Sequence, residues 1–151
     1  MSLRFPYQQL PVGRPLVSLQ GRTAQPRPLI PVTLIGPTGT STQDALLDTG
    51  ADDTVFPKRV AAKIGLDLST APLSSGATAG QAVMGLRYAQ VTVRIADNQE
   101  QREWTAWVGF TPAKLRQPLL GFAGFLQYFT ATFFGDREEV ELAVNSLYAG
   151  T

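Results

Sequence analysis

The chain has 151 residues, of which 44% are apolar and 17% charged, and its formal net charge is +1. This composition is typical of one globular domain, and the balanced charge gives no reason to expect nucleic acid or an anionic membrane as a partner. Cysteine and histidine are both absent, which excludes disulfides, Cys/His zinc sites, thiol nucleophiles and Ser–His pairs. If the protein is an enzyme, its proton chemistry falls to Asp, Glu, Lys or Tyr, or to a carboxylate-bound metal.

The N-terminal segment, residues 1–26, is rich in Pro, Gln and Arg. We interpret it as a basic arm or linker, in which Pro15–Leu19 can still form a short strand. It lacks the apolar run of a secretory signal, and no stretch of the chain has the uninterrupted apolar length of a membrane span. We therefore expect a cytoplasmic protein with no membrane partner.

A single domain is predicted over residues 27–145, followed by a tail at 146–151. The run Leu29–Ile35, the turn cluster Gly36–Thr40 and the run Gln43–Leu47 predict a β-hairpin. Pro57–Ile64 is expected to be a short helix, because proline stands in its first turn and glycine follows its end.

The second half of the predicted domain continues with short elements. Pro72–Gln81 is rich in small residues and predicts a flexible loop. Further elements are expected in chain order: strands at Arg87–Ile95 and Glu103–Val108, a second short helix at Gly121–Phe129, and a hairpin at about 130–144. Many short strands with one or two short helices predict an all-β fold of mainly antiparallel strands.

The segment Ala45–Val55 contains the candidate catalytic residue, Asp48. An apolar strand runs directly into Asp48, followed by Thr49 and Gly50. A carboxylate set against two leucines lies at the edge of the core, where its charge is costly. Gly50 lets the backbone turn sharply, and the hydroxyl of Thr49 can donate a hydrogen bond within the loop. The tripeptide alone is equally compatible with a strand that ends in an ordinary Asx turn.

The longer string Ala45–Val55 resembles the active-site segment of the retroviral proteases, the retropepsin branch of the aspartic proteases. Other segments resemble parts of the same family in the same order, over about residues 27–134. They are Arg27–Ile30 (the N-terminal strand), Tyr88–Ile95 (the strand that leaves the flap), Val108–Pro112 (a substrate-side loop) and Leu119–Leu126 (the apolar–apolar–Gly segment beneath the active site).

The resemblance implies a retropepsin-like closed antiparallel β barrel and an aspartic endopeptidase that acts on a polypeptide substrate. It implies no cofactor, no metal and no nucleic acid. Two Asp-Thr-Gly loops are needed for the shared carboxylate pair, and this chain has one. A homodimer is therefore expected, in which each copy contributes Asp48.

The roles of other residues follow from the same resemblance. Thr49 and Gly50 would support the active-site loop, with Thr49 bonded across the two-fold axis, and Arg27 would stabilise the dimer by reaching Asp52 of the other copy. The remaining expected positions are substrate-binding: Ala51, Asp52, Asp53, Thr78, Ala79 and Gly80 (the last three at the flap tip), and Thr111, Pro112 and Ala113 (beside the pocket nearest the cut).

The sequence departs from the family pattern at three places. Phe122 and Ala123 follow Gly121 where the retroviral sequences have Arg-Asn, the flap lacks doubled glycines, and the chain continues past Phe134 into a hairpin. These changes favour an alternative, a catalytically inactive retropepsin-like module that dimerises or binds peptides. A third reading, a phosphate-binding turn at Gly36–Thr40, lacks the lysine and the following helix that a phosphate loop needs.

Overall fold

The computed structural model describes the backbone of residues 2–79 and 82–151, and the side chains of residues 2–74 and 85–151. The strands are β1 (Ser2–Pro6), β2 (Gln8–Leu16), β3 (Arg22–Arg27), β4 (Leu29–Ile35), β5 (Thr40–Leu47), β6 (Val55–Pro57), β7 (Leu73–Ala79), β8 (Ala82–Ala96), β9 (Gln101–Thr111), β10 (Leu119–Leu120), β11 (Phe129–Phe134) and β12 (Glu139–Val144). One α-helix, α1 (Lys58–Ile64), and two 3-10 turns, η1 (Val17–Leu19) and η2 (Leu126–Tyr128), complete the elements. None of the described helices has the length and apolar character to cross a bilayer.

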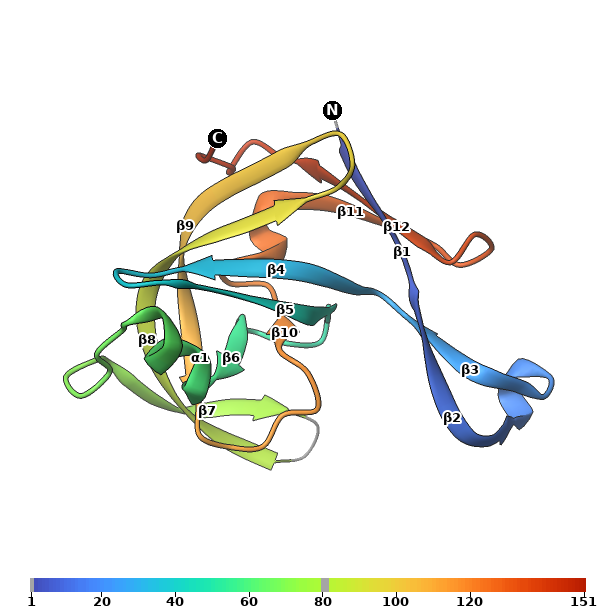
Figure 1. Ribbon diagram of the computed structural model, residues 1–151, viewed down its shortest axis with the longest axis horizontal. Coiled ribbons are helices and arrows are strands. Elements are labelled where there is room, and N and C mark those ends of the chain that lie inside the picture. The colour runs from blue at the N-terminus through green and yellow to red at the C-terminus, as the bar shows by residue number, and fades with distance from the viewer. Residues whose placement is uncertain (1, 80–81) are drawn as a thin grey trace.

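A closed barrel of six strands forms the body of the protein (Figure 1). The strands follow one another in the order β4-β5-β10-β6-β9-β8, and pairing of β8 with β4 closes the ring. The expected all-β barrel is thus present, but its strands are mixed in direction: β10 runs parallel to β5, and β6 runs parallel to β9. The predicted antiparallel barrel departs from the structure only at these two pairings, because the short strands β10 and β6 lie between β5 and β9, a placement that hairpin signals do not reveal.

The first predicted hairpin and the first predicted helix are confirmed. Strands β4 and β5 pair over their whole lengths, and α1 begins after Pro57 and ends at Gly65, whose φ of 86° is a left-handed conformation that favours glycine. The turn between β4 and β5 packs against this end of the helix, where the Thr38 N–H donates to the Ile64 carbonyl. The turn cluster at Gly36–Thr40 therefore has a packing role.

The second predicted helix is wrong. Gly121–Phe129 contains only the short turn η2. Gly124 has a φ of 89°, and the N–H groups of Phe122 and Ala123 donate to Ala51 and Asp52 of the β5–β6 loop instead of to a helix. A run of apolar residues cannot distinguish a helix from a segment whose backbone bonds are made to a distant loop.

The N-terminal segment is not a free arm. β1 pairs with β12 in a three-stranded sheet, β1-β12-β11, and places Leu3 and Phe5 in the main hydrophobic core. The predicted C-terminal hairpin, β11 and β12, is confirmed in the same sheet. The Arg4 N–H of β1 donates to the Asp97 carboxylate from the β8–β9 turn, so this turn covers the outer edge of β1.

Residues 146–151, expected as a tail, lie against the barrel. Trp104 of β9 makes edge-to-face contacts with Phe125, Phe129 and Tyr148, at centroid distances of 5.2–5.9 Å. The Tyr148 hydroxyl donates to the Glu103 carbonyl. Burial of an aromatic ring is a large apolar contribution, and it ties the end of the chain to β9.

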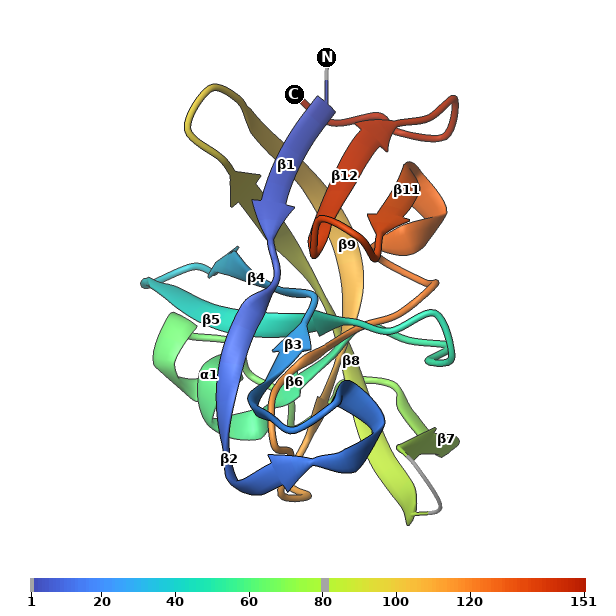
Figure 2. The same ribbon diagram turned by 90° about the vertical axis from the view of Figure 1, so that its right-hand side faces the viewer.

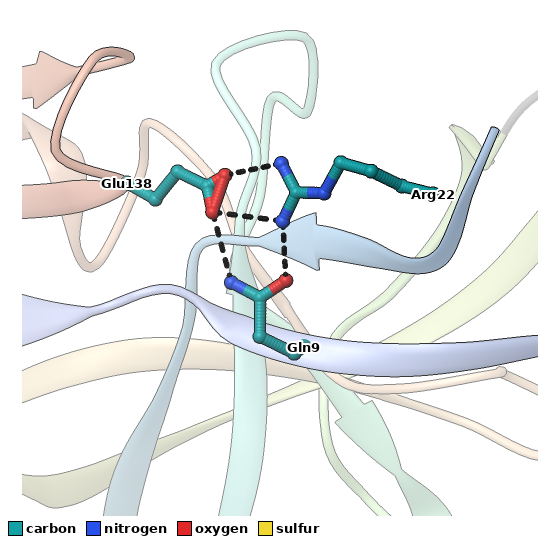
Figure 3. A network of polar contacts seen from close by, with 3 residues as sticks. All are labelled: Gln9, Arg22 and Glu138. Carbon is teal, nitrogen blue, oxygen red and sulfur yellow. Dashed lines mark hydrogen bonds and ion pairs between the residues drawn. The ribbon is translucent and has the colours of Figure 1, made fainter. Parts of the chain in front are cut away.

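Strands β2 and β3 form a separate two-stranded hairpin that projects from the barrel (Figures 1 and 2). One polar network holds it to the turn between β11 and β12 (Figure 3). Both terminal nitrogens of Arg22 donate to Glu138, at 2.8 and 3.0 Å, and Gln9 bridges the two residues. The Tyr7 N–H also donates to the Glu138 carbonyl, at 2.7 Å. Glu138 thus anchors the hairpin to the turn between β11 and β12.

The hairpin anchor should depend on pH. The hydrogen bond from Arg22, with a smaller contribution from Gln9, holds the pKa of Glu138 below its usual value of 4.5. Because folding lowers this pKa, the ion pair stabilises the folded state above pH 4.5, and the stabilisation is lost as the pH falls through the lowered pKa. At pH 6, Glu138→Gln should therefore speed hydrogen exchange in β2 and β3 relative to the wild type.

The difference between Glu138→Gln and the wild type should shrink as the pH falls through the lowered pKa of Glu138, because protonation removes the charge that Arg22 binds. Asp136→Asn, an exposed change in the same turn, is the control and should leave exchange in the hairpin unaltered. A difference that does not shrink as the pH is lowered would show that the charge of Glu138 does not anchor the hairpin.

Candidate active site

Asp48 stands immediately after β5, at the edge of the barrel core. Leu47 before it is buried, the Asp48 side chain is half-buried, and Thr49 and Gly50 are exposed. The Asp48 Oδ1 accepts the Gly50 N–H at 2.9 Å, and its backbone carbonyl accepts the Ala51 N–H. These bonds close a tight turn, so the carboxylate is oriented by its own loop and leaves its second oxygen available for other partners.

Strand β10 holds the loop in place from the side. It runs parallel to β5, and the Leu120 carbonyl accepts the Asp48 N–H at 3.1 Å. On the other side, the Leu47 N–H donates to the Pro28 carbonyl at the start of β4. The backbone that leads into Asp48 is therefore bonded to neighbours on both sides, which gives the carboxylate a rigid base.

Gly121 lets the segment that follows β10 pass directly under the loop that follows Asp48. A Cβ at this position would lie 2.6 Å from the Ala51 carbonyl oxygen and closer still to that of Asp53. The Phe122 N–H donates to Ala51, and Asp53 forms a parallel bridge with Ala123. The backbone contacts of this segment are thus made although Phe122 replaces the family arginine, and the Phe122 side chain is 61% exposed.

Asp53 has a partner that the sequence analysis missed. The Tyr88 hydroxyl, from β8, donates to Asp53 Oδ2 at 3.0 Å. Burial, and then the neighbouring Asp53 carboxylate, raises the pKa of the Tyr88 hydroxyl above its usual value of 10.0. The hydroxyl therefore stays protonated at acid and neutral pH and remains a donor that orients Asp53. No local sequence signal joins these residues, because β8 and the loop meet only through the barrel.

Buried Thr54 makes a second contact that the sequence did not predict. Its hydroxyl donates to the Ala123 carbonyl at 2.8 Å, and the same carbonyl accepts the Thr54 N–H. The position of a threonine just before a buried strand gave no indication of this role, which depends on the segment that passes beneath.

The predicted substrate-side residues Thr111, Pro112 and Ala113 follow β9. Pro57, in the strand after the active-site loop, pairs with Thr111, and the Thr111 hydroxyl accepts the Ala113 N–H at 3.0 Å. All three residues contribute to the wall of an open hollow of about 430 Å³, together with Lys58 and neighbouring side chains. The barrel thus brings this loop to the end of β6.

The other predicted positions are spread over three elements. Asp52 is exposed in the active-site loop, and Arg27, half-buried, ends β3. Among the described ion pairs of the single chain, none joins Arg27 to Asp52. Thr78 and Ala79 end β7 and pair with β8, so the expected loop at Pro72–Gln81 is largely strand. The predicted flap residue Gly80 lies outside the described residues.

Comparisons with known proteins agree with this geometry. The sequence profile of a family described as aspartyl protease matches residues 30–123. The crystal structure of a retropepsin-like aspartic protease from Rickettsia conorii is similar over 94% of this chain and 90% of that chain, with a TM-score of 0.54 and 18% sequence identity. At this identity the likeness shows a shared fold. The search of curated proteins found no match.

Gly121→Ala should disrupt the loop that holds Asp48. The added methyl group would meet the Ala51 and Asp53 backbone, and a backbone clash cannot be relieved by a rotamer change. We expect a loss of about 3 kcal/mol in the free energy of unfolding, measured by urea denaturation. Gly135→Ala is the matched control, because a Cβ at Gly135 has open space around it. Equal stability of the two variants would contradict the close approach of Gly121.

Proposed function

The chain belongs to the aspartyl protease family and is retropepsin-like, and from this membership we propose that it is an aspartic endopeptidase in which two copies each contribute Asp48 to one catalytic pair. The observation that carries the proposal is the placement of Asp48: a half-buried carboxylate at the end of a barrel strand, with one oxygen held by the Gly50 N–H. The chain contains a single Asp-Thr-Gly sequence, so one copy supplies half of the pair.

The proposed chemistry follows from the repulsion between two carboxylates. At a separation of about 3 Å both cannot be ionised, so the pair holds one proton. The ionised carboxylate takes a proton from a water molecule while the water oxygen attacks the scissile carbonyl. The protonated carboxyl donates to the developing oxyanion, and a proton is then passed to the leaving amine as the C–N bond breaks. The products are a carboxylic acid and an amine.

The surrounding residues are assigned supporting roles. We propose that Thr49 donates a hydrogen bond across the two-fold axis and that Gly50 lets the two loops approach each other. Ala51, Asp52 and Asp53 would contact the substrate backbone and flanking side chains. The support for Asp53 is its fixed orientation by Tyr88, because a carboxylate held in one direction can select a hydrogen-bond donor on the substrate.

Two further groups of residues would border the peptide. Thr78, Ala79 and Gly80 are proposed as the tip of a flap that covers the substrate. Thr111, Pro112 and Ala113 would line the pocket nearest the cut, a role supported by their position in the wall of the open hollow.

The alternative, an inactive module that only dimerises or binds peptides, is favoured by one specific change, the exposed Phe122 in the family's arginine position. The contacts of the loop with Gly121 and Ala123 favour the enzyme, since they are made without that arginine. A peptide library assayed at mildly acid pH separates the two functions.

Asp48→Asn should abolish peptide hydrolysis, because the amide has the shape of the carboxylate but cannot exchange the proton. We expect the rate to fall by about 10²–10⁴-fold or more, with the dimer retained in sedimentation. Asp44→Asn, an exposed substitution on the same strand, is the matched control and should keep the wild-type rate. Wild-type cleavage by the Asp48→Asn protein, purified free of other proteases, would refute the assignment.

An Arg27–Asp52 pair between the copies is also proposed, since both residues flank the active-site strand and Asp52 is exposed in a single copy. Arg27→Ala should weaken dimerisation and activity together, by about 1–3 kcal/mol. Asp52→Ala should cost a similar amount, and the double variant little more. If the two losses in dimerisation free energy simply add, the residues do not interact.

A further inference from the structure

The β2–β3 hairpin has almost no packing partner within its own chain. Its two strands pair only with each other in the described part of the protein, and no side chain from Gln8 to Arg27 is buried. Val17, at the tip, is 96% exposed. An isolated two-stranded hairpin is marginally stable in water, yet the Arg22–Glu138 network fixes this one in a defined direction. Such pre-organisation is useful for a hairpin that binds something outside its own chain.

The base of the hairpin lies beside the candidate catalytic residue. Pro28, directly after β3, accepts the N–H of Leu47, directly before Asp48. Figures 1 and 2 show the hairpin projecting from the barrel on the side where β5 ends. For two Asp48 carboxylates to meet, a second copy has to approach this same end of β5. The hairpin therefore projects from the side of the barrel that the second copy must approach.

The charges on the two sides are complementary. Besides Arg22, which is paired with Glu138 of its own chain, the hairpin carries Arg14 and Arg27 and no acidic residue. Residues 28–57 carry no Lys or Arg and contain four aspartates, at positions 44, 48, 52 and 53. Across a two-fold axis, the basic hairpin of one copy would face the acidic loop of the other. This arrangement reduces repulsion between the four aspartates of each copy as the two loops come together.

We propose that the β2–β3 hairpin is a dimerisation arm that docks on a second copy of this chain beside the shared active site. The proposal rests on the proposed function, because the shared site requires the second copy. Prolines interrupt both strands, Pro11 and Pro15 in β2 and Pro26 in β3, and proline cannot donate to a neighbouring strand. The arm therefore docks through its side chains, with Val17 at its tip.

The terminal sheet is less suited to this role. Its edge strand β1 pairs on one side with β12 of its own chain, and on its outer edge Asp97 already accepts the N–H of Arg4. Addition of a partner strand to β1 would have to displace this contact.

The test compares two exposed apolar positions in the Asp48→Asn background, which prevents self-digestion. Val17→Asp changes the tip of the arm, and Leu147→Asp, at a residue that is 61% exposed near the C-terminus, is the control. In sedimentation equilibrium, Val17→Asp should raise the dimer dissociation constant by about tenfold or more, because the contact occurs twice in a two-fold dimer. Leu147→Asp should leave it unchanged. Thermal unfolding of both proteins as monomers should match the parent.

Because the chain has no cysteine, Val17→Cys and Leu147→Cys each allow one fluorophore to be attached. Emission from position 17 should shift as protein concentration rises, along the same curve as sedimentation, and emission from position 147 should not. A parent protein that stays monomeric, or a Val17→Asp dimer as tight as the parent's, would overturn the proposal. So would a Val17→Asp enzyme, with Asp48 intact, that loses activity while its dimer is unaffected, since the arm would then contact the substrate. Absence of proteolysis by the wild type would overturn only the proposed function, because the sedimentation result does not depend on activity.

Discussion

The close approach of Gly121 to the loop after Asp48 is the constraint on which the rest of the site depends. A side chain at this position would collide with the Ala51 and Asp53 carbonyls, and without it the segment after β10 runs directly beneath the loop and bonds to it. The parallel pairing of β10 with β5 places that segment, and the closed barrel in turn fixes β10. The short loop Thr49-Gly50-Ala51 becomes rigid because other strands hold it on two sides.

This arrangement also explains how the site is maintained without the arginine of the retroviral pattern. The backbone of the Gly121–Ala123 segment makes its contacts through N–H and carbonyl groups, which any residue except proline supplies at position 122. The side chain at that position is therefore released from a structural role, and an exposed phenylalanine occupies it. The backbone contacts beneath the loop thus do not depend on the side chain at position 122.

Two regions lie outside the barrel, the sheet β1-β12-β11 and the β2–β3 hairpin. The sheet β1-β12-β11 joins both ends of one chain and shares the main core through Leu3 and Phe5, so a single copy satisfies its own terminal strands. The β2–β3 hairpin is held to the β11–β12 turn by Glu138, which binds Arg22 and Gln9. The proposed dimerisation arm lies beside Asp48, on the side of the barrel that a second copy would have to approach.

The local features of this chain could be predicted from its amino-acid order: the hairpin around Gly36–Thr40, the helix from Lys58 to Ile64, the C-terminal hairpin, and Asp48 as the carboxylate at the end of an apolar strand. These are set by turn residues, end signals and alternation within a few positions. Long-range packing set the parallel strands β6 and β10, the absence of the second helix, the burial of β1 and the Tyr88–Asp53 hydrogen bond. Each of these depends on groups far apart in the chain, whose pairing is chosen by barrel closure and by the need to satisfy buried backbone groups, and neither requirement leaves a pattern in neighbouring residues.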